Sequence, residues 1–284
     1  MHIQFHPLLH IFNLSIETGV FPNNLKIAKV IPIFKAGDPS VVNNYRPISV
    51  LPALSKVLER LMHNRINSFL LKYNILNKNQ YGFREKHSTY MALANVVDEI
   101  TSTVEDRKYV IGIFLDLSKA FDTVDHNILL HKLYIYGLRG KVHDWISNYL
   151  KNRYQYVNIN LTSSDLQNVV CGVPQSSILG PLLFLIYMND ITASSKNCKF
   201  TMFADDTTIL YKHENLLKGA TQVNKELVIV HDWLCSNKLS LNTDKTNFIV
   251  FHTTGKKVTE IEEKKNIYYD KESDSNKILR CYHQ

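Results

Sequence analysis

The chain has 284 residues, of which 45% are hydrophobic and 21% are charged. This composition is typical of a globular protein that is long enough to bury a core. The formal charge of +7 favours a polyanionic partner without identifying one. The four cysteines form no C-x-x-C pair, which argues against a zinc knuckle or a disulfide framework and indicates a reducing compartment.

No apolar run reaches the length of a membrane span, and the first ten residues lack the positive lead and the cleavage site of a signal peptide. We therefore expect an intracellular protein, nuclear or cytoplasmic, that makes no contact with a membrane.

Apolar periodicity and turn residues predict helices and strands along most of the chain. The expected helices cover residues 8–21, 53–73, 88–104, 127–136, 142–150, 180–190 and 217–234. The expected strands and hairpins cover residues 25–35, 44–49, 109–117, 154–170, 199–211 and 248–251.

Two basic residues come together in the first predicted hairpin. Strand, turn and strand bring Lys35 near Arg46. An Arg fork binds two phosphate oxygens at once and Lys supplies a compact charge, so the pair suits phosphate. Surface charges that flank a turn explain the pair equally well.

A polar loop, residues 79–89, precedes the helix expected over 88–104. It mixes Tyr81, Phe83 and Arg84 in the way that template-binding surfaces mix aromatic and basic side chains. Capping of the helix by Ser88 or Thr89 is an equally good local explanation for the end of this loop.

Three acidic residues stand at the ends of predicted strands. Asp116 ends an almost unbroken apolar run, and Asp205 and Asp206 occupy the tip of the 199–211 hairpin. A solvated turn would explain the pair alone. If both strands share one antiparallel sheet, the three carboxylates converge, and a set of oxygen ligands selects Mg²⁺ or Mn²⁺. The matching chemistry is two-metal phosphoryl transfer.

Three segments, in this order, carry a family resemblance. Phe114–Asp122, Gly172–Pro181 and Phe203–Asp206 resemble the palm motifs of reverse transcriptases, most closely those of non-LTR retrotransposons of the long-interspersed and jockey-like kind. The resemblance covers about residues 8–252.

The resemblance implies an α+β fold, with the fingers and palm of a right-hand polymerase, an antiparallel palm sheet with packed helices, and a thumb that is largely missing. The implied divisions are an upstream helical segment (1–24), fingers (25–108), a palm with inserted fingers elements (109–252) and a charged tail (253–284). The tail is sparse in apolar residues and is not expected to pack a core.

The resemblance also implies an activity, that of an RNA-directed DNA polymerase that uses Mg²⁺ or Mn²⁺. Its partners would be an RNA template, a DNA primer and dNTPs, and endonuclease activity would come from a missing region or another protein. Asp116, Asp205 and Asp206 would be the catalytic metal ligands.

Further site residues follow from the same resemblance. Lys35 and Arg46 would hold the triphosphate, Phe121 would exclude a 2′-hydroxyl, and Gln175 would lie in the nucleotide-binding loop. Lys245 would lie close to the triphosphate, and Tyr81, Phe83 and Arg84 would lie along the template path. For Phe121 a packed aromatic residue, and for Lys245 a surface lysine, are the alternatives.

One residue departs from the family pattern. Ser176 stands where the family has glycine after Gln175, and a side chain there forfeits part of the freedom to adopt positive φ. This keeps open a decayed retroelement remnant that binds nucleic acid without turnover. Another palm enzyme, such as an RNA-dependent RNA polymerase or a nucleotidyl cyclase, is the third hypothesis, which Phe121 disfavours.

Overall fold

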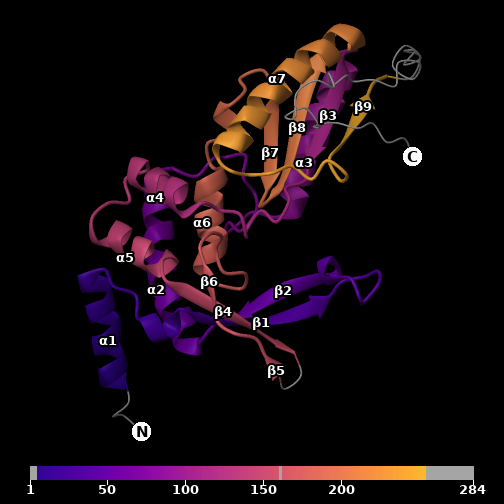
Figure 1. The fold of residues 1–284 in the computed structure, drawn as a ribbon. Helices are drawn as coiled ribbons and strands as arrows, with labels where there is room; N and C mark the ends of the chain where they lie inside the picture. The colour runs from indigo at the N-terminus through magenta and orange to yellow at the C-terminus, as the bar shows by residue number, and fades with distance from the viewer. Residues whose placement is uncertain (1–4, 160–161, 254–284) are drawn as a thin grey trace. The chain divides into compact units, whose positions relative to one another are not determined.

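The computed structural model describes residues 5–159 and 162–253. The described chain forms two compact units (Figure 1). Unit 1 contains the chain up to Leu76 and Phe121–Tyr187, and unit 2 contains Asn77–Ala120 and the chain from Met188. Most of the tail expected over 253–284 lies outside the described residues.

Unit 1 combines helices with a sheet. Its helices are α1 (Phe5–Thr18), α2 (Ala53–Lys72), α4 (His126–Ile135), α5 (Lys141–Leu150) and α6 (Leu179–Met188), with short 3₁₀ turns at Asn23–Leu25 and Val42–Asn44. Its strands are β1 (Ile27–Phe34), β2 (Tyr45–Val50), β4 (Arg153–Ile159), β5 (Thr162–Ser163) and β6 (Gln167–Val169).

The sheet of unit 1 has the order β2-β1-β4-β5, and β6 also pairs with β4. The β1–β2 hairpin is antiparallel as expected, whereas β1 and β4 run parallel. Helix α6 is apolar on every side, and its residues from Leu182 to Met188 are all at most 3% exposed. A helix of this kind belongs in the centre of a core.

Unit 2 is built on one antiparallel sheet. Its strands are β3 (Tyr109–Leu115), β7 (Lys199–Phe203), β8 (Asp206–His213) and β9 (Asn247–Phe251), in the order β7-β8-β3-β9. Its helices are α3 (Thr89–Glu105) and α7 (Leu216–Ser236), with a 3₁₀ turn at Ile191–Ala193. The antiparallel sheet expected for the palm is present.

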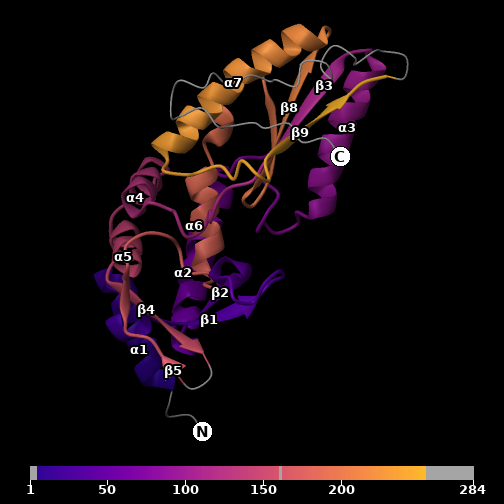
Figure 2. The same ribbon diagram turned by 45° about the vertical axis from the view of Figure 1, so that its right-hand side comes forward.

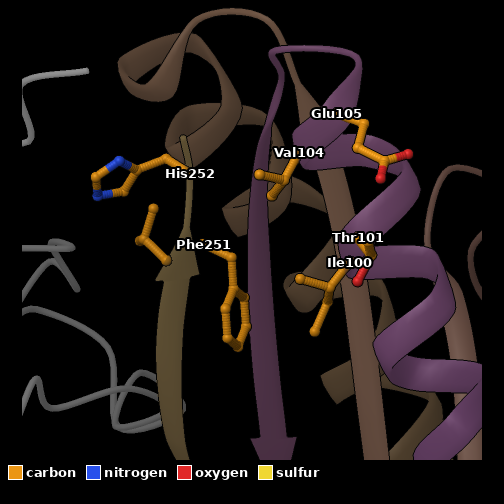
Figure 3. Close-up of a pocket in the computed structure, with 7 residues that line it drawn as sticks. Ile100, Thr101, Val104, Glu105, Phe251 and His252 are labelled. Carbon is orange, nitrogen blue, oxygen red and sulfur yellow. The ribbon is translucent and has the colours of Figure 1, made fainter. Parts of the chain in front are cut away.

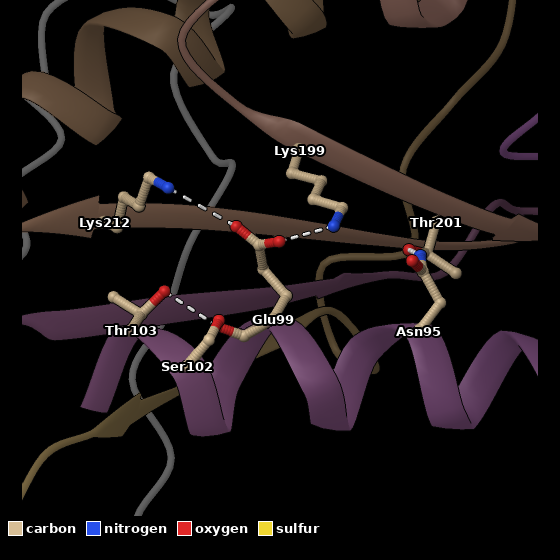
Figure 4. Close-up of polar contacts among 7 residues, drawn as sticks. All are labelled: Asn95, Glu99, Ser102, Thr103, Lys199, Thr201 and Lys212. Atoms are coloured by element: carbon tan, nitrogen blue, oxygen red, sulfur yellow. Dashed lines mark hydrogen bonds and ion pairs between the residues drawn. The ribbon is translucent and has the colours of Figure 1, made fainter. Parts of the chain in front are cut away.

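Helices α3 and α7 pack on opposite faces of this sheet (Figures 1 and 2). On one face, Glu99 of α3 forms ion pairs with Lys199 of β7 and Lys212 of β8 (Figure 4). The bond from Lys199 lowers the pKa of Glu99. On the other face, Gly219 of α7 lies beside Ile111 of β3. Side chains alternate along a strand, so β3 is covered on both sides, as its apolar run predicts.

The expected elements are all found, with shifts of a few residues at their ends, and Ser88 caps α3 by accepting a bond from the Met91 amide. The ranges 25–108 and 109–252 each contribute to both units, and their assignment as fingers and palm stays a prediction. Within residues 5–159 and 162–253, no helix is both long enough and apolar enough to cross a membrane.

Candidate active site

The sheet of unit 2 brings three carboxylates to one end. Leu115 of β3 pairs with Thr207 of β8, so the next residues in register, Asp116 and Asp206, lie opposite each other. Ala204 and Asp205 form the two-residue turn that joins β7 to β8. Phe203 and Asp206 pair with each other on either side of this turn. Strand register thus sets the two adjacent strand ends that carry the acids side by side, in the one antiparallel sheet that the sequence predicts.

Asp206 is affected electrostatically by the two other acids. Partial desolvation, together with the negative charges of Asp205 and Asp116, raises the pKa of Asp206. A bound cation would relieve the repulsion between these carboxylates, and a donor set made only of oxygen atoms fits Mg²⁺ or Mn²⁺. In the described part of the chain, however, no three His, Cys, Asp or Glu side chains are gathered closely enough to hold an ion. The ligand assignment stays a prediction.

Replacing Asp206 with asparagine is expected to stabilise the folded protein at pH 7. Because the pKa of Asp206 is raised on folding, the native state binds more protons between the ordinary and the raised pKa, and the free energy of unfolding falls as pH rises through that window. Asp206 is exposed, so we expect a gain below about 1 kcal/mol.

Urea denaturation at pH 7 and near pH 3 measures this effect. The gain should vanish at the lower pH, where Asp206 is protonated in both states, and Asp98→Asn, an exposed residue on α3, serves as the control. A gain that persisted at low pH would contradict repulsion among the carboxylates as its cause.

A turn after α7 holds the main chain of Asp116. The Asp116 amide donates to Oγ1 of Thr246 at 3.2 Å, and its carbonyl accepts from the Asn242 amide at 2.8 Å. Thr246 is only 2% exposed. Lys245 is exposed in the same turn, so the structure places it beside the strand end that carries Asp116.

The loop before α3 lies against the turn that carries Asp205. The Tyr81 amide donates to the Met202 carbonyl at 2.8 Å, and the Met202 amide donates to Asn79 at 2.8 Å. Phe83 is 55% exposed. Arg84 donates from Nη1 to the carbonyls of Asn77 and Gln80, and burial lowers its pKa. Arg84 thus stabilises its own loop through these bonds. Its role in template binding stays a prediction.

Two further predicted site residues, Gln175 and Phe121, lie in unit 1 on segments that contact each other. Gln175 donates from Nε2 to both carboxylate oxygens of Asp122, at 2.9 and 3.0 Å. Phe121, next to Asp122, stacks on Phe184 with ring centroids 4.4 Å apart. A Cβ on Gly172 would lie 2.7 Å from the Asp122 carbonyl oxygen, so the loop approaches this segment more closely than a side chain permits.

Ser176 has positive φ, the backbone conformation that is costly for a residue with a side chain. This is the conformation that the glycine of the family pattern would adopt easily. The Ser177 amide donates to the Pro174 carbonyl at 3.1 Å, which closes a turn with Gln175 and Ser176 at its centre. Ser176 has φ +77°, the value that the third residue of a type II turn requires and that glycine adopts most easily. The left-handed region costs a non-glycine residue about 1 kcal/mol.

A buried acid anchors the segment after this turn. Glu59 on α2 is fully buried and accepts from the amides of Ile178 and Leu179 at 2.8 and 3.3 Å, and from the Ser55 hydroxyl at 2.9 Å. Burial, with the charge of Glu59, raises the pKa of Tyr149. These amides belong to the start of α6, whose first N–H groups have no partner within the helix.

Lys35 and Arg46 lie on the same face of the β1–β2 hairpin. Arg46 pairs with Ile33, and Lys35 follows two residues later, with its amide bonded to the Asn44 carbonyl. Diagonal neighbours of this kind lie about 7–8 Å apart. The hairpin that the sequence predicts is present, both side chains are exposed, and their shared role stays a prediction.

Figure 3 shows a surface pocket, whose volume is about 420 Å³. It is lined by residues near the end of α3, among them Val104, and by Phe251 and His252. Phe251 pairs with Val110 near the start of β3, whereas Asp116 follows the end of that strand. This pocket is therefore separate from the candidate active site.

Sequence reasoning did not single out Gln80, Gly82, Thr246, Asp122 or Glu59. The first three hold backbone next to the carboxylates, and the other two hold the Gln175 loop. In the sequence, these residues stand out only as polar or glycine residues within or near a motif. The local sequence does not show which distant backbone group each of them contacts.

Comparison with known proteins agrees with this geometry. The family described as reverse transcriptase (RNA-dependent DNA polymerase) matches residues 33–276. Two structures of telomerase from Candida tropicalis share the fold, with TM-scores of 0.59 and 0.55 at 13% and 14% identity. They cover 88% and 89% of this chain, which covers 45% and 56% of theirs. The fold is that of a polymerase palm and fingers, and the chain belongs to the reverse transcriptase family.

The similar sequences come from non-LTR retrotransposons. The RNA-directed DNA polymerase from mobile element jockey of Drosophila melanogaster is 31% identical over 88% of this chain. The probable RNA-directed DNA polymerase from transposon X-element of the same organism is 32% identical over 85%. The chain spans 28% and 27% of the length of these relatives.

Proposed function

We propose that this chain is the RNA-directed DNA polymerase domain of a non-LTR retroelement, which transfers a nucleotide from a dNTP to a primer 3′-hydroxyl on an RNA template. The observation that carries the proposal is the register of β3 and β8, which sets Asp116 opposite Asp206 beside Asp205. The similarity of the chain to the RNA-directed DNA polymerases of jockey and the X-element supports the reaction.

The carboxylates would hold the divalent cations of the reaction. Asp116 and Asp205 supply the main oxygen ligands, and Asp206 supports them. When bound, Mg²⁺ or Mn²⁺ would activate the 3′-hydroxyl and stabilise the pyrophosphate leaving group. The turn of Asn242 and Thr246 holds the main chain of Asp116, which supports the proposed role of Asp116 as a ligand.

The remaining motif residues would bind the nucleotide and the template. Lys35 and Arg46 bind the triphosphate, Phe121 excludes a 2′-hydroxyl, and Gln175 contacts the nucleotide. Lys245 lies close to the triphosphate and can protonate the leaving pyrophosphate. Tyr81, Phe83 and Arg84 contact the template. Each role is proposed from the motif position of the residue and from its chemistry.

Primer extension tests the proposal. The purified chain is given an RNA template, a DNA primer, Mg²⁺ and either dNTPs or rNTPs. We expect extension with dNTPs, and we expect Asp205→Asn to reduce its rate by about a thousand-fold or more, because a metal ligand is lost. Asp98→Asn on α3 should extend normally. Equal rates for Asp205→Asn and the unmodified chain, or a preference for rNTPs, would contradict the proposal.

A catalytically decayed remnant is the second candidate, favoured by the left-handed conformation of Ser176. In that case the chain retains the fold and binds nucleic acid but does not extend a primer. Ser176→Gly removes the side chain that opposes the type II turn. Extension by Ser176→Gly alone would identify a polymerase inactivated at this loop, and extension by the unmodified chain would exclude the remnant.

A further inference from the structure

The turn that carries Asp205 is held in an unusual conformation. Of its two central residues, Ala204 has φ +59° and Asp205 does not have positive φ. This is the pattern of a type II′ hairpin turn, whose first central residue is normally glycine. Alanine opposes this conformation. A contact from outside the turn that favours this conformation would therefore stabilise Ala204 in it.

Gln80 makes that contact with both polar groups of the Ala204 main chain. Its Oε1 accepts from the Ala204 amide at 2.9 Å, and its Nε2 faces the Ala204 carbonyl at 3.4 Å. The same Oε1 also accepts from the Gly82 amide at 2.7 Å. Gln80 is only 2% exposed, so water does not compete for these bonds.

The segment that carries Gln80 is itself fixed to the sheet. Residues on both sides of Gln80 exchange backbone bonds with Met202 of β7, and Gln80 forms an isolated parallel bridge with Met202. Arg84 bonds back to the Gln80 carbonyl at 3.0 Å. A side chain held in this way can impose a conformation on its partner, because its own position is already determined.

We propose that Gln80 is a positioning residue, whose side-chain amide holds Ala204 in the left-handed conformation and so fixes Asp205 and Asp206 relative to Asp116. The inference rests on the proposed function, since it assigns Gln80 a part in cation binding by the three carboxylates. Gln80 touches no reacting atom. Its effect passes through the backbone of Ala204 into the side chains of the next two residues.

The binding of Mn²⁺ alone to the full chain, followed by electron paramagnetic resonance, tests the proposal without requiring turnover. Gln80→Met keeps the volume of the side chain and removes both hydrogen-bonding groups. We expect it to weaken Mn²⁺ binding by about ten-fold or more, as the loss of a residue that orients metal ligands does. The matched control Gln222→Met, an exposed residue on α7, should bind as the unmodified chain does.

A second substitution separates positioning from general packing. Ala204→Gly makes the left-handed conformation accessible without help, so Gln80→Met should weaken Mn²⁺ binding less in the Ala204→Gly background than in the unmodified one. An equal loss in both backgrounds would overturn the proposal. Where Gln80→Met does not fold, Gln80→Asn, whose amide is one methylene too short to reach Ala204, replaces it in both backgrounds.

The remaining outcomes are also decisive. Unchanged Mn²⁺ binding by a folded Gln80 variant would overturn the positioning role while leaving the proposed function intact. A folded, unmodified chain whose Mn²⁺ binding is absent, or is unaffected by Asp205→Asn, would contradict the proposed function, and this inference would fail with it. Circular dichroism and thermal unfolding of each variant show which of these cases applies.

Discussion

Replacing Gly82 with alanine is expected to destabilise unit 2 by about 3 kcal/mol or more and to weaken Mn²⁺ binding as well. A Cβ at this position would lie 2.2 Å from the Ala204 amide nitrogen and 2.9 Å from the Phe203 carbonyl carbon. Both atoms belong to the backbone, so no side chain can rotate to make room. The turn that carries Asp205 would have to move.

Urea denaturation and Mn²⁺ titration measure the two effects of Gly82→Ala. The matched control is Gly112→Ala on β3, where the nearest atoms to a Cβ are the ends of side chains, Phe251 at 3.1 Å and Leu210 at 3.4 Å. These can shift, so the control should lose far less stability. If Gly82→Ala behaved like Gly112→Ala, the close approach of the loop to the turn would be refuted.

Replacing Glu59 with alanine is expected to destabilise unit 1 by about 3 kcal/mol or more. The substitution would leave the Ile178 and Leu179 amides without their acceptor and would open a cavity in the core. Buried donors without partners are costly because they have also lost their bonds to water. The segment that follows Gln175 and Ser176 would lose its anchor.

Thermal unfolding and primer extension of Glu59→Ala check this expectation. Glu17→Ala, which replaces an exposed acid on α1, is the control and should change stability by less than about 0.5 kcal/mol. Glu59→Gln keeps the size of the side chain and one acceptor oxygen, so its loss should be intermediate. Equal stability of the Glu59→Ala and Glu17→Ala variants would show that Glu59 does not anchor α6.

The strands and the turn that carry the carboxylates could be predicted from the sequence because each has a clear local pattern. The apolar run before Asp116 and the β-branched and aromatic residues around Asp205 and Asp206 define the strands. Strand register then sets Asp116 opposite Asp206. The left-handed conformation of Ser176 was predictable for a similar reason, because the turn chemistry is local.

The supporting contacts could not be predicted in this way. Gln80 meets Ala204 across 124 residues, and Glu59 meets Ile178 across 119. No periodicity identifies which distant backbone group a polar side chain will reach. Glu59 lies in a helix that also carries exposed charged residues, such as Arg60, so the sequence alone does not distinguish its buried carboxylate from a solvated one.

The parallel pairing of β1 with β4 was missed for the same reason. Each strand has a recognisable pattern, and the hairpin partner of β1 is its neighbour in sequence. The parallel partner arrives only after the helices α2, α3, α4 and α5. Local patterns identify strands, but long-range pairing depends on the packing of the whole unit.

The interleaving of the two units has a consequence for synthesis on the ribosome. Unit 1 cannot close until residues up to Tyr187 have been made, and the central strand β3 of unit 2 must wait for β8 and β9. Until then, the apolar edges of β3 are unpaired while the nascent chain grows by more than 90 residues. Such long-range closure slows folding and exposes strands to aggregation, so the nascent chain should depend on chaperones that bind extended apolar segments.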